Sequence, residues 1–233
     1  MHNHDTDIVH GHDHGHGNTI LSELMCHFPY AVFSVAFALS VLSFLVYISF
    51  LGNTDQKMIC QGSDALFHSF HFMHIVFAAT GTLITFFRYS QNIIRGLLVG
   101  LFSASVFCTL SDVVFPYLAG SIMGVHMHFH ICFMTEMHNI LPFLVVGLIN
   151  GFIMSRHHAS QQERFSIFSH FVHILVSSFA SMFYLVSHGC TDWYLNIGYV
   201  FLFLVVAVVV PCTLSDVVVP MTFAQADKKH AKH

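Results

Sequence analysis

Long apolar stretches alternate with short polar ones along most of the chain. A helix that crosses a bilayer needs roughly 20 apolar residues, because it rises ~1.5 Å per residue through a hydrocarbon core about 30 Å thick. Six stretches reach that length: residues 20–51, 65–87, 96–119, 128–154, 165–187 and 197–219. The pattern therefore predicts an all-α integral membrane protein with six transmembrane helices in a lipid bilayer.

Composition points to the same class of protein. Hydrophobic residues make up 55% of the 233 positions and charged residues only 9%, which is more apolar than a soluble domain of this length requires. No nucleic-acid partner is expected. The first seventeen residues contain neither a basic segment nor a short apolar core before a cleavage site, so we expect the mature chain to keep them.

The basic residues are distributed unevenly between the two sides of the predicted bundle. Seven of the eight Lys and Arg fall in segments that follow the second, fourth and sixth stretches, and only Lys57 falls on the opposite side. Cytoplasmic loops carry the excess of Lys and Arg. We therefore predict that both termini are cytoplasmic, in a bacterial inner membrane. Cys60 and Cys190 would then lie outside, where a disulfide could form.

Two motifs occur twice, in the same order. The segment Cys108-Thr-Leu-Ser-Asp-Val-Val-Phe-Pro116 near the end of the third stretch matches Cys212-Thr-Leu-Ser-Asp-Val-Val-Val-Pro220 near the end of the sixth, with eight of nine residues identical. His71-Phe-Met-His74 in the second stretch corresponds to His170-Phe-Val-His173 in the fifth. Such internal repetition indicates two related halves.

Each half holds three predicted spans, an odd number, so the second half must enter the membrane from the opposite side. The predicted fold is therefore six transmembrane helices arranged as two inverted three-helix repeats. Its parts are a His-rich cytoplasmic tail (1–19), a first repeat (20–119), a second repeat (120–221) and a cytoplasmic tail (222–233). Many transporters are built this way, with the substrate site at the repeat interface, but channels are too, and a fold alone establishes no activity.

Aspartates and histidines repeat with these motifs inside the apolar stretches. An Asp at the centre of a transmembrane helix costs about 2.5–3.5 kcal/mol on insertion scales, so such residues normally face a protein interior or a water-filled path. A spacing of three places both histidines of a pair on one helix face. The candidate ligand groups are His71, His74 and Asp112 in the first half and His170, His173 and Asp216 in the second.

The predicted topology also sets the depth of these groups. Counting ~1.5 Å per residue from the span ends puts the first group roughly 10 Å below the outer surface and the second close to the cytoplasmic surface. Each aspartate could ligate a metal directly or support a ligating histidine through its N–H. We therefore predict two mirrored metal sites, one toward each face. Histidines that only hydrogen-bond neighbouring helices are the alternative.

Further polar side chains flank both groups. In the fourth stretch, His130, Glu136 and His138 would extend the outer site, with His130 and His138 on one helix stripe. Glu23 and His27 in the first stretch would extend the inner site.

Prolines in the third, fourth and sixth stretches add backbone acceptors. A proline within a helix leaves the carbonyl four residues earlier without its usual donor. This predicts freed carbonyls at Asp112, Asp216 and His138, unless the prolines only kink their helices.

The N-terminal tract is rich in histidine. Six histidines and three aspartates fall within the first sixteen residues, among glycines. Such a tract is typical of disordered metal-binding segments and could deliver ions at the cytoplasmic mouth. A solvated tail with weak affinity is equally compatible with the sequence.

These features predict membrane transport of a divalent transition-metal cation, with zinc the first choice and iron, nickel or copper next. The chain has no nucleotide-binding or hydrolase motif, so an enzyme is not expected, and a homo-oligomer is compatible with the sequence. The main alternative is a membrane redox protein or metalloenzyme whose histidines hold haem or a fixed metal. A storage or sensing protein would bind the same ions without moving them.

Overall fold

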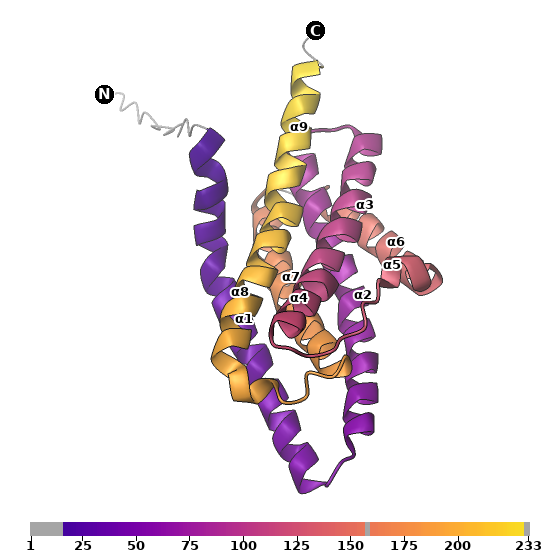
Figure 1. The fold of residues 1–233 in the computed structure, drawn as a ribbon. Helices are drawn as coiled ribbons and strands as arrows, with labels where there is room; N and C mark the ends of the chain where they lie inside the picture. Colours follow the sequence, from indigo (N-terminus) through magenta and orange to yellow (C-terminus); the bar gives the residue numbers. More distant parts are fainter. Residues whose placement is uncertain (1–15, 157–158, 231–233) are drawn as a thin grey trace, which may run out of the picture.

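A computed structural model describes the backbone of residues 16–156 and 159–230, and the side chains of residues 25, 27–156 and 168–227 (Figure 1). Within these ranges the chain is helical apart from turns and one irregular connection. Six segments are long and apolar enough to cross a membrane: His27–Leu51, Gln56–Tyr89, Ile93–Ile122, Met137–Met154, Phe168–Ser187 and Trp193–Asp227. The prediction of an all-helical protein with six candidate spans is therefore confirmed.

The elements follow one another with short connections. In chain order they are α1 (His16–Leu51), α2 (Gln56–Tyr89), α3 (Ile93–Thr109), the π-helical turn η1 (Leu110–Val114), α4 (Phe115–Ile122), α5 (Cys132–Thr135), α6 (Met137–Met154), α7 (Ala159–Ser187), the 3-10 turn η2 (Trp193–Asn196), α8 (Ile197–Thr213), the π-helical turn η3 (Leu214–Val218) and α9 (Val219–His230). The two π-helical turns continue straight into the helices on either side, so α3 to α4 and α8 to α9 each form one long rod.

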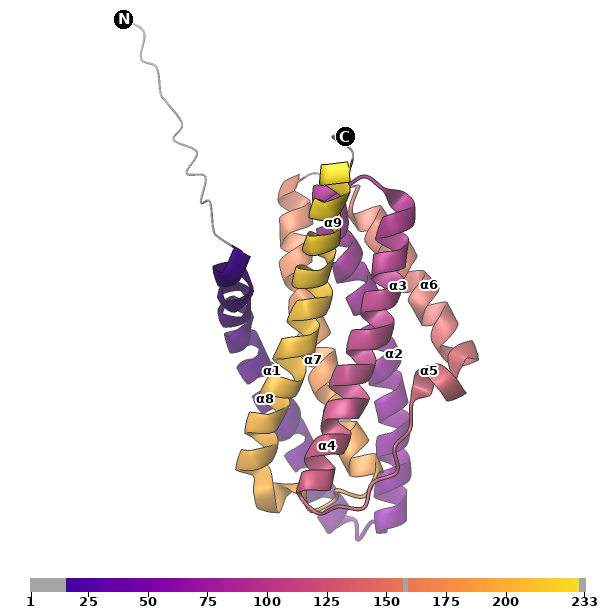
Figure 2. The same cartoon turned by 45° about the horizontal axis from the view of Figure 1, so that its top comes forward.

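Helices α2 and α7 form the centre of the bundle, and the others surround them (Figures 1 and 2). Most of the spanning part of α2 and of α7 is buried, whereas α1, α3 and α6 bury a third or less of theirs. Large apolar side chains on the surrounding helices stay exposed, for example Phe44, Leu98 and Val146. Such a surface is what lipid contact requires.

Helix α6 approaches α2 closely through two glycines spaced four apart. A Cβ at Gly147 would lie 2.8 Å from the carbonyl oxygen of Val76, and one at Gly151 would lie 2.8 Å from the Cβ of Leu83. Small residues at this spacing let membrane helices approach closely and gain van der Waals contact. Thr80 uses this proximity to donate from its hydroxyl to the Gly147 carbonyl at 3.1 Å.

The connections gather at two ends of the bundle. The start of α1, the α2–α3 connection, the end of α6 and the end of α9 lie at the upper end in Figure 1, and the α1–α2, α4–α5 and α7–α8 connections lie toward the lower end. At the upper end, Asp227 of α9 accepts from Ser90 and pairs with Arg95 of α3. This contact ties the last helix to the α2–α3 connection.

The fourth apolar stretch differs from the prediction. Helix α6 begins at Met137, and residues 125–131 are irregular rather than helical. In this segment histidines alternate with apolar residues, a period that suits an extended chain lying on a surface. Met127 is partly buried between the exposed His126 and His128. The predicted helix stripe that joins His130 to His138 is therefore wrong.

Two smaller expectations also change. Helix α9 continues to His230, so residues 222–230 of the predicted C-terminal tail are helical. Cys60 and Cys190 are both free thiols, so the disulfide that their position allowed is not formed. The His-rich residues 1–15 and the side chain of Glu23 lie outside the described parts of the chain.

Candidate metal centre

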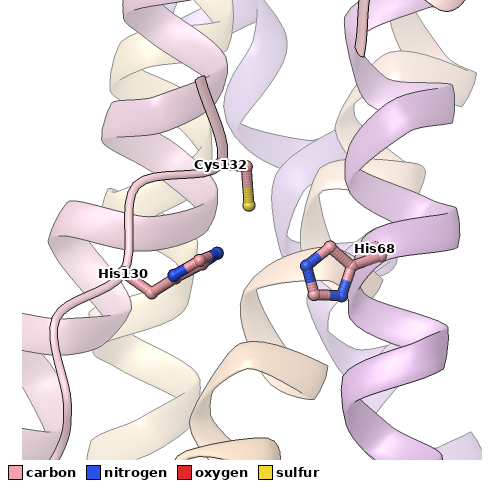
Figure 3. Close-up of side chains that lie close together, drawn as sticks. All are labelled: His68, His130 and Cys132. Carbon is pink, nitrogen blue, oxygen red and sulfur yellow. The ribbon is translucent and has the colours of Figure 1, made fainter. Parts of the chain in front are cut away.

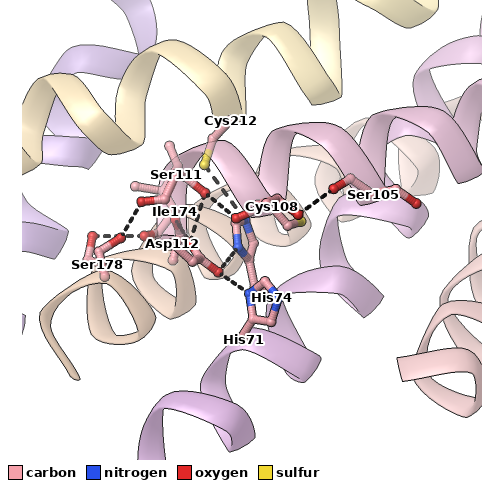
Figure 4. A network of polar contacts seen from close by, with 12 residues as sticks. His71, His74, Ser105, Cys108, Ser111, Asp112, Ile174, Ser178 and Cys212 are labelled. Carbon is pink, nitrogen blue, oxygen red and sulfur yellow. Dashed lines mark hydrogen bonds and ion pairs between the residues drawn. The ribbon is translucent and has the colours of Figure 1, made fainter. Parts of the chain in front are cut away.

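The first predicted ligand group is present and fully buried. His71 and His74 project from α2 toward the π-helical turn that carries Asp112 (Figure 4). Asp112 Oδ2 lies 2.8 Å from His71 Nδ1 and 2.6 Å from His74 Nδ1. Its other oxygen, Oδ1, accepts from Ser111 and from Ser177 of α7, each at 2.8 Å. The carboxylate therefore has four hydrogen-bond donors around it.

The second predicted group has the same geometry. Asp216 Oδ2 lies 2.9 Å from His170 Nδ1 and 2.6 Å from His173 Nδ1. His173 and Asp216 are almost completely buried, and His170 is 8% exposed. In each group the potential ligand atoms lie within 4.8 Å of one another, so the predicted assembly of both groups is confirmed.

The prediction that the two groups lie toward opposite faces is wrong. The rings of His74 and His173 are only 4.4 Å apart between centroids, so the groups adjoin in the interior. Cys212 joins them, with its Sγ 3.8 Å from His74 Nε2 and within 4.8 Å of a ring nitrogen of His173. The depth was misjudged because α2 and α7 begin well before the predicted spans, which moves the motifs to mid-helix.

The hydrogen bonds fix which ring nitrogens remain available. A carboxylate accepts, so each Nδ1 donates its proton and each neutral imidazole keeps its lone pair on Nε2. His71 Nε2 and His170 Nε2 are buried without a hydrogen-bond partner among the described residues. Histidines that ligate metals commonly donate their other N–H to a carboxylate in this way. The sequence allowed two roles for Asp112 and Asp216: direct ligation of a metal, or support of a ligating histidine through its N–H. Their hydrogen bonds match the second role.

The repeated prolines act on a different carbonyl from the one predicted. Both Leu-Ser-Asp-Val-Val segments form a π-helical turn, in which the amide of Phe115 bonds to the carbonyl of Leu110, five residues earlier. The proline that follows Phe115 therefore frees the carbonyl of Ser111, not that of Asp112. The Ser181 hydroxyl replaces the missing backbone donor and donates to Ser111 O at 2.9 Å.

In the second half, too, a side-chain hydroxyl takes the place of the missing backbone donor. Pro220 follows η3, and the freed carbonyl is that of Ser215, which accepts from the Thr82 hydroxyl at 3.0 Å. Both freed carbonyls thus accept a hydrogen bond from a hydroxyl in the opposite half of the chain.

A third cluster lies toward the lower end of the bundle. His68 of α2, His130 of the irregular segment and Cys132 of α5 bring ligand atoms within 4.8 Å of one another (Figure 3). Glu136 Oε1 is 2.9 Å from His68 Nε2 and 3.7 Å from His130 Nε2. His130 and Glu136 thus meet as predicted, whereas His138 is exposed and belongs to none of the ligand groups of the described residues.

Cys132 was missed because a cysteine in an apolar stretch is usually a small buried hydrophobe. Burial raises the pKa of its thiol to about 12. The sulfur therefore carries its proton at neutral pH unless a cation displaces it. His68 lies three residues before His71, on the same face of α2, and this spacing in the sequence links the third cluster to the central groups.

His27 of α1 lies against the second group at the opposite side. Its ring is 4.0 Å from that of His170 between centroids, in an edge-to-face arrangement. His27 thus contacts the second group, although it belongs to none of the ligand groups of the described residues. Imidazoles thus follow one another through the bundle, in the order His130, His68, His71, His74, His173, His170 and His27. The step from His68 to His71 rests on their spacing of three along α2 and on the Phe67 ring, which contacts both.

Comparisons of the chain with protein-family models, with characterised proteins and with solved structures give no match.

Proposed function

We propose that the protein moves a divalent transition-metal cation across the membrane along this row of imidazoles, with zinc the first choice of substrate. The observation that supports it is the contact between the two His/Asp groups at His74 and His173, which makes the row continuous through the interior. An ion that leaves water needs replacement ligands at every step, and imidazole nitrogens suit zinc, iron, nickel and copper.

Charge supports a cation as the substrate. Two carboxylates, Asp112 and Asp216, are buried in the centre, and no Lys or Arg is buried among the described residues. An uncompensated charge in such surroundings costs several kcal/mol. A divalent cation between the two groups would balance both carboxylates, and protons on the histidines would do so when no ion is bound.

Matched contacts in the two halves support an inverted repeat. Ser181 of α7 donates to the first π-helical turn, and Thr82 of α2 donates to the second. Each half thus supports the motif of the other. Rocking of one half against the other would then expose the central groups to each side in turn, which is how inverted repeats work in transporters.

The orientation follows from the basic residues. Arg88, Arg95 and Arg156 belong to the connections at the upper end, whereas Lys57 belongs to the lower end. Under the positive-inside rule the upper end would face the cytoplasm of a bacterium, together with both termini. The row then runs from His130 outside to His27 inside.

Flux measurements test the proposal. Proteoliposomes with the full chain should take up Zn²⁺, and Asp112→Asn, Asp216→Asn and the double variant should each lose most of this uptake. His138→Gln changes an exposed histidine outside the row and should transport as the parent does. Parental uptake in both aspartate variants would refute the proposed path.

One observation favours a second candidate, a membrane protein with a fixed metal centre. Asp112 has four donors around its carboxylate, which restricts the movement that an ion in transit requires. A fixed centre would copurify with metal that does not exchange with added isotope, and vesicles would show no uptake. Haem fits less well, because the rings of His74 and His173 at 4.4 Å leave no room for a porphyrin between them.

A further inference from the structure

We propose that His68, His130, Cys132 and Glu136 form a second, separate binding site for a borderline divalent cation such as Zn²⁺, which fastens the irregular segment of residues 125–131 to α2. We call these four residues the lower cluster. The site includes His130 and His68, the outer end of the proposed row, so a resident ion there would leave the transport path to begin at His71. The site can hold the segment in place whether or not another ion crosses the membrane.

The geometry of the lower cluster approaches that of a four-ligand site. Zinc bonds of about 2.0–2.3 Å at a tetrahedral angle put neighbouring ligand atoms about 3.3–3.8 Å apart. Glu136 Oε1 is 2.9 Å from His68 Nε2 and 3.7 Å from His130 Nε2, and the ligand atoms of His68, His130 and Cys132 lie within 4.8 Å of one another. Glu136 is not among the residues whose ligand atoms all lie within that distance, so its carboxylate would have to move toward the Cys132 sulfur to complete the tetrahedron.

Hydrogen bonding at His68 points to a positive charge inside the cluster. Its Nδ1 lies 2.8 Å from the carbonyl oxygen of Asp64, which can only accept, so Nδ1 carries the proton. In the neutral ring Nε2 then carries a lone pair; it lies 2.9 Å from the carboxylate oxygen of Glu136 but has no hydrogen-bond partner among the described residues. Two acceptors at that distance repel each other unless a cation or a proton lies between them.

The neighbouring thiol favours a metal ion over a proton. Cys132 is 1% exposed, and its sulfur points into the space between His68 and His130 (Figure 3). A proton shared by His68 and Glu136 gives that sulfur nothing to bind. A borderline cation uses the imidazoles, the carboxylate and the sulfur together.

A resident ion would also add to the contacts that hold the segment between α4 and α6. Without an ion the segment is held by ordinary contacts: Val125 and Met127 pack on the core, the Val125 amide donates to Gly120 O at 3.0 Å, Phe129 lies 4.9 Å from Tyr117 between centroids, and the His128 carbonyl accepts from Tyr184 at 3.4 Å. Four ligands drawn from α2, the segment itself, α5 and the residue before α6 would hold these parts together. Sites closed by four protein ligands are typical of structural zinc.

Cobalt spectroscopy of the full-length protein in detergent provides the test. Co²⁺ bound to a thiolate gives an intense charge-transfer band that Co²⁺ on histidines alone lacks. Because Cys108 and Cys212 both adjoin the central groups (Figure 4), the measurement uses a background with Cys108→Ser and Cys212→Ser. We expect a thiolate band there that Cys132→Ser abolishes, with a loss of one bound equivalent per chain. The His-rich segment of residues 1–19 contains no cysteine and cannot produce the band.

Two further variants make the result decisive. Cys60→Ser removes a thiol from the same helix as His68 but outside the lower cluster, and should leave the band unchanged. Glu136→Gln keeps the side-chain shape and should weaken Co²⁺ binding at least tenfold without unfolding the chain. A band that persists in Cys132→Ser, or that disappears in Cys60→Ser, overturns the proposal. Failure of Zn²⁺ uptake with the band intact would refute transport alone.

Discussion

Asp112 and Asp216 occupy the same place in the same repeated motif, yet their second carboxylate oxygens meet different surroundings. Asp112 Oδ1 accepts hydrogen bonds from Ser111 and Ser177 at 2.8 Å each. Asp216 Oδ1 is buried without a hydrogen-bond partner among the described residues. The group around Asp112, which we call the first group, is thus saturated with donors, and the second group around Asp216 retains one vacant acceptor.

One part of the difference lies within the motif, because the Ser111 hydroxyl donates to Asp112 whereas the Ser215 hydroxyl lies 3.4 Å from that of Thr82. The other part comes from the opposing helix. Ser177 stands four residues after His173 on α7, and the corresponding position after His74 on α2 is Ala78. The second group also lies against the backbone of α2, since a Cβ at Gly81 would come within 2.7 Å of Asp216 Oδ2. Burying an acceptor without a donor costs free energy, and this favours the binding of a cation or a water molecule at that oxygen. If the proposed path is right, the second group would be the better place for an ion to exchange and the first the better place to hold one.

Neutralising each aspartate should give the largest difference between the groups. Asp112→Asn places an amide NH2 against the hydroxyls of Ser111 and Ser177 and removes charge-assisted bonds, for an expected loss of about 3 kcal/mol in stability. Asp216→Asn loses fewer bonds and should cost about half as much. Thermal unfolding in detergent measures both, and a larger loss in Asp216→Asn would contradict the assignment of saturated and vacant groups.

Added bulk should affect the second group through Gly81. Gly81→Ala forces a methyl into the Asp216 carboxylate, and overpacking of this kind costs about 2 kcal/mol. Gly198→Ala is the matched control, because a Cβ at Gly198 meets no atom within 4 Å. Unfolding midpoints of the two variants, together with Zn²⁺ affinity, check the expectation. Equal behaviour would mean that Asp216 can move away at no cost.

Sequence alone predicted which residues form each group but not where the groups lie. The repeated motifs and the spacing of three in His71-Phe-Met-His74 were sufficient to assemble the ligands, because both constraints are local. The depth of the groups was not predicted correctly, because it was counted from span ends that hydropathy places only approximately. Helix α2 begins at Gln56 rather than near residue 65. The contact between His74 and His173 depends on the true depth of the two groups, so it was not predicted.

Other features depended on contacts that have no local signature. The π-helical turns moved the freed carbonyl from Asp112 to Ser111, and a sequence with proline at the same place fits either register. The position of Cys132 beside His68 and His130 depended on an irregular segment, just before α5, that hydropathy assigned to a helix. Ser177 and Ala78 were visible as a difference between the halves, but only the packing of α7 against η1 shows that Ser177 reaches Asp112.

Exchanging the serine between the halves should move the extra donor from one group to the other. Ser177→Ala removes one bond to a charged oxygen, for a loss of about 1.5 kcal/mol. Ala78→Ser places a hydroxyl donor near Asp216 Oδ1. It should raise the free energy of unfolding by up to about 1 kcal/mol, reduced by the packing cost of the added oxygen. Unfolding of the two single variants and the double variant measures this. Destabilisation by Ala78→Ser as large as that by Ser177→Ala would show that residue 78 does not reach Asp216.

The smallest expected effects concern the feature that the two halves share. Thr82→Val and Ser181→Ala each remove the hydroxyl that satisfies a carbonyl freed by proline, those of Ser215 and Ser111. Each should cost about 1 kcal/mol, and the two costs should be equal, because the turns match. A change at the proline gives a sharper result than the hydroxyl variants alone.

The proline change works because it returns a backbone donor to the same carbonyl. In a π-helical register, Pro220→Ala supplies an N–H to Ser215 O, so the Thr82 hydroxyl becomes redundant there. Thr82→Val should therefore cost much less in the Pro220→Ala background, a coupling of about 0.5–1 kcal/mol in a double-mutant cycle. Ser181→Ala with Pro116→Ala should behave alike. Additive costs in both cycles would mean that the prolines free some other carbonyl, and that the likeness of the two halves ends at the aspartates.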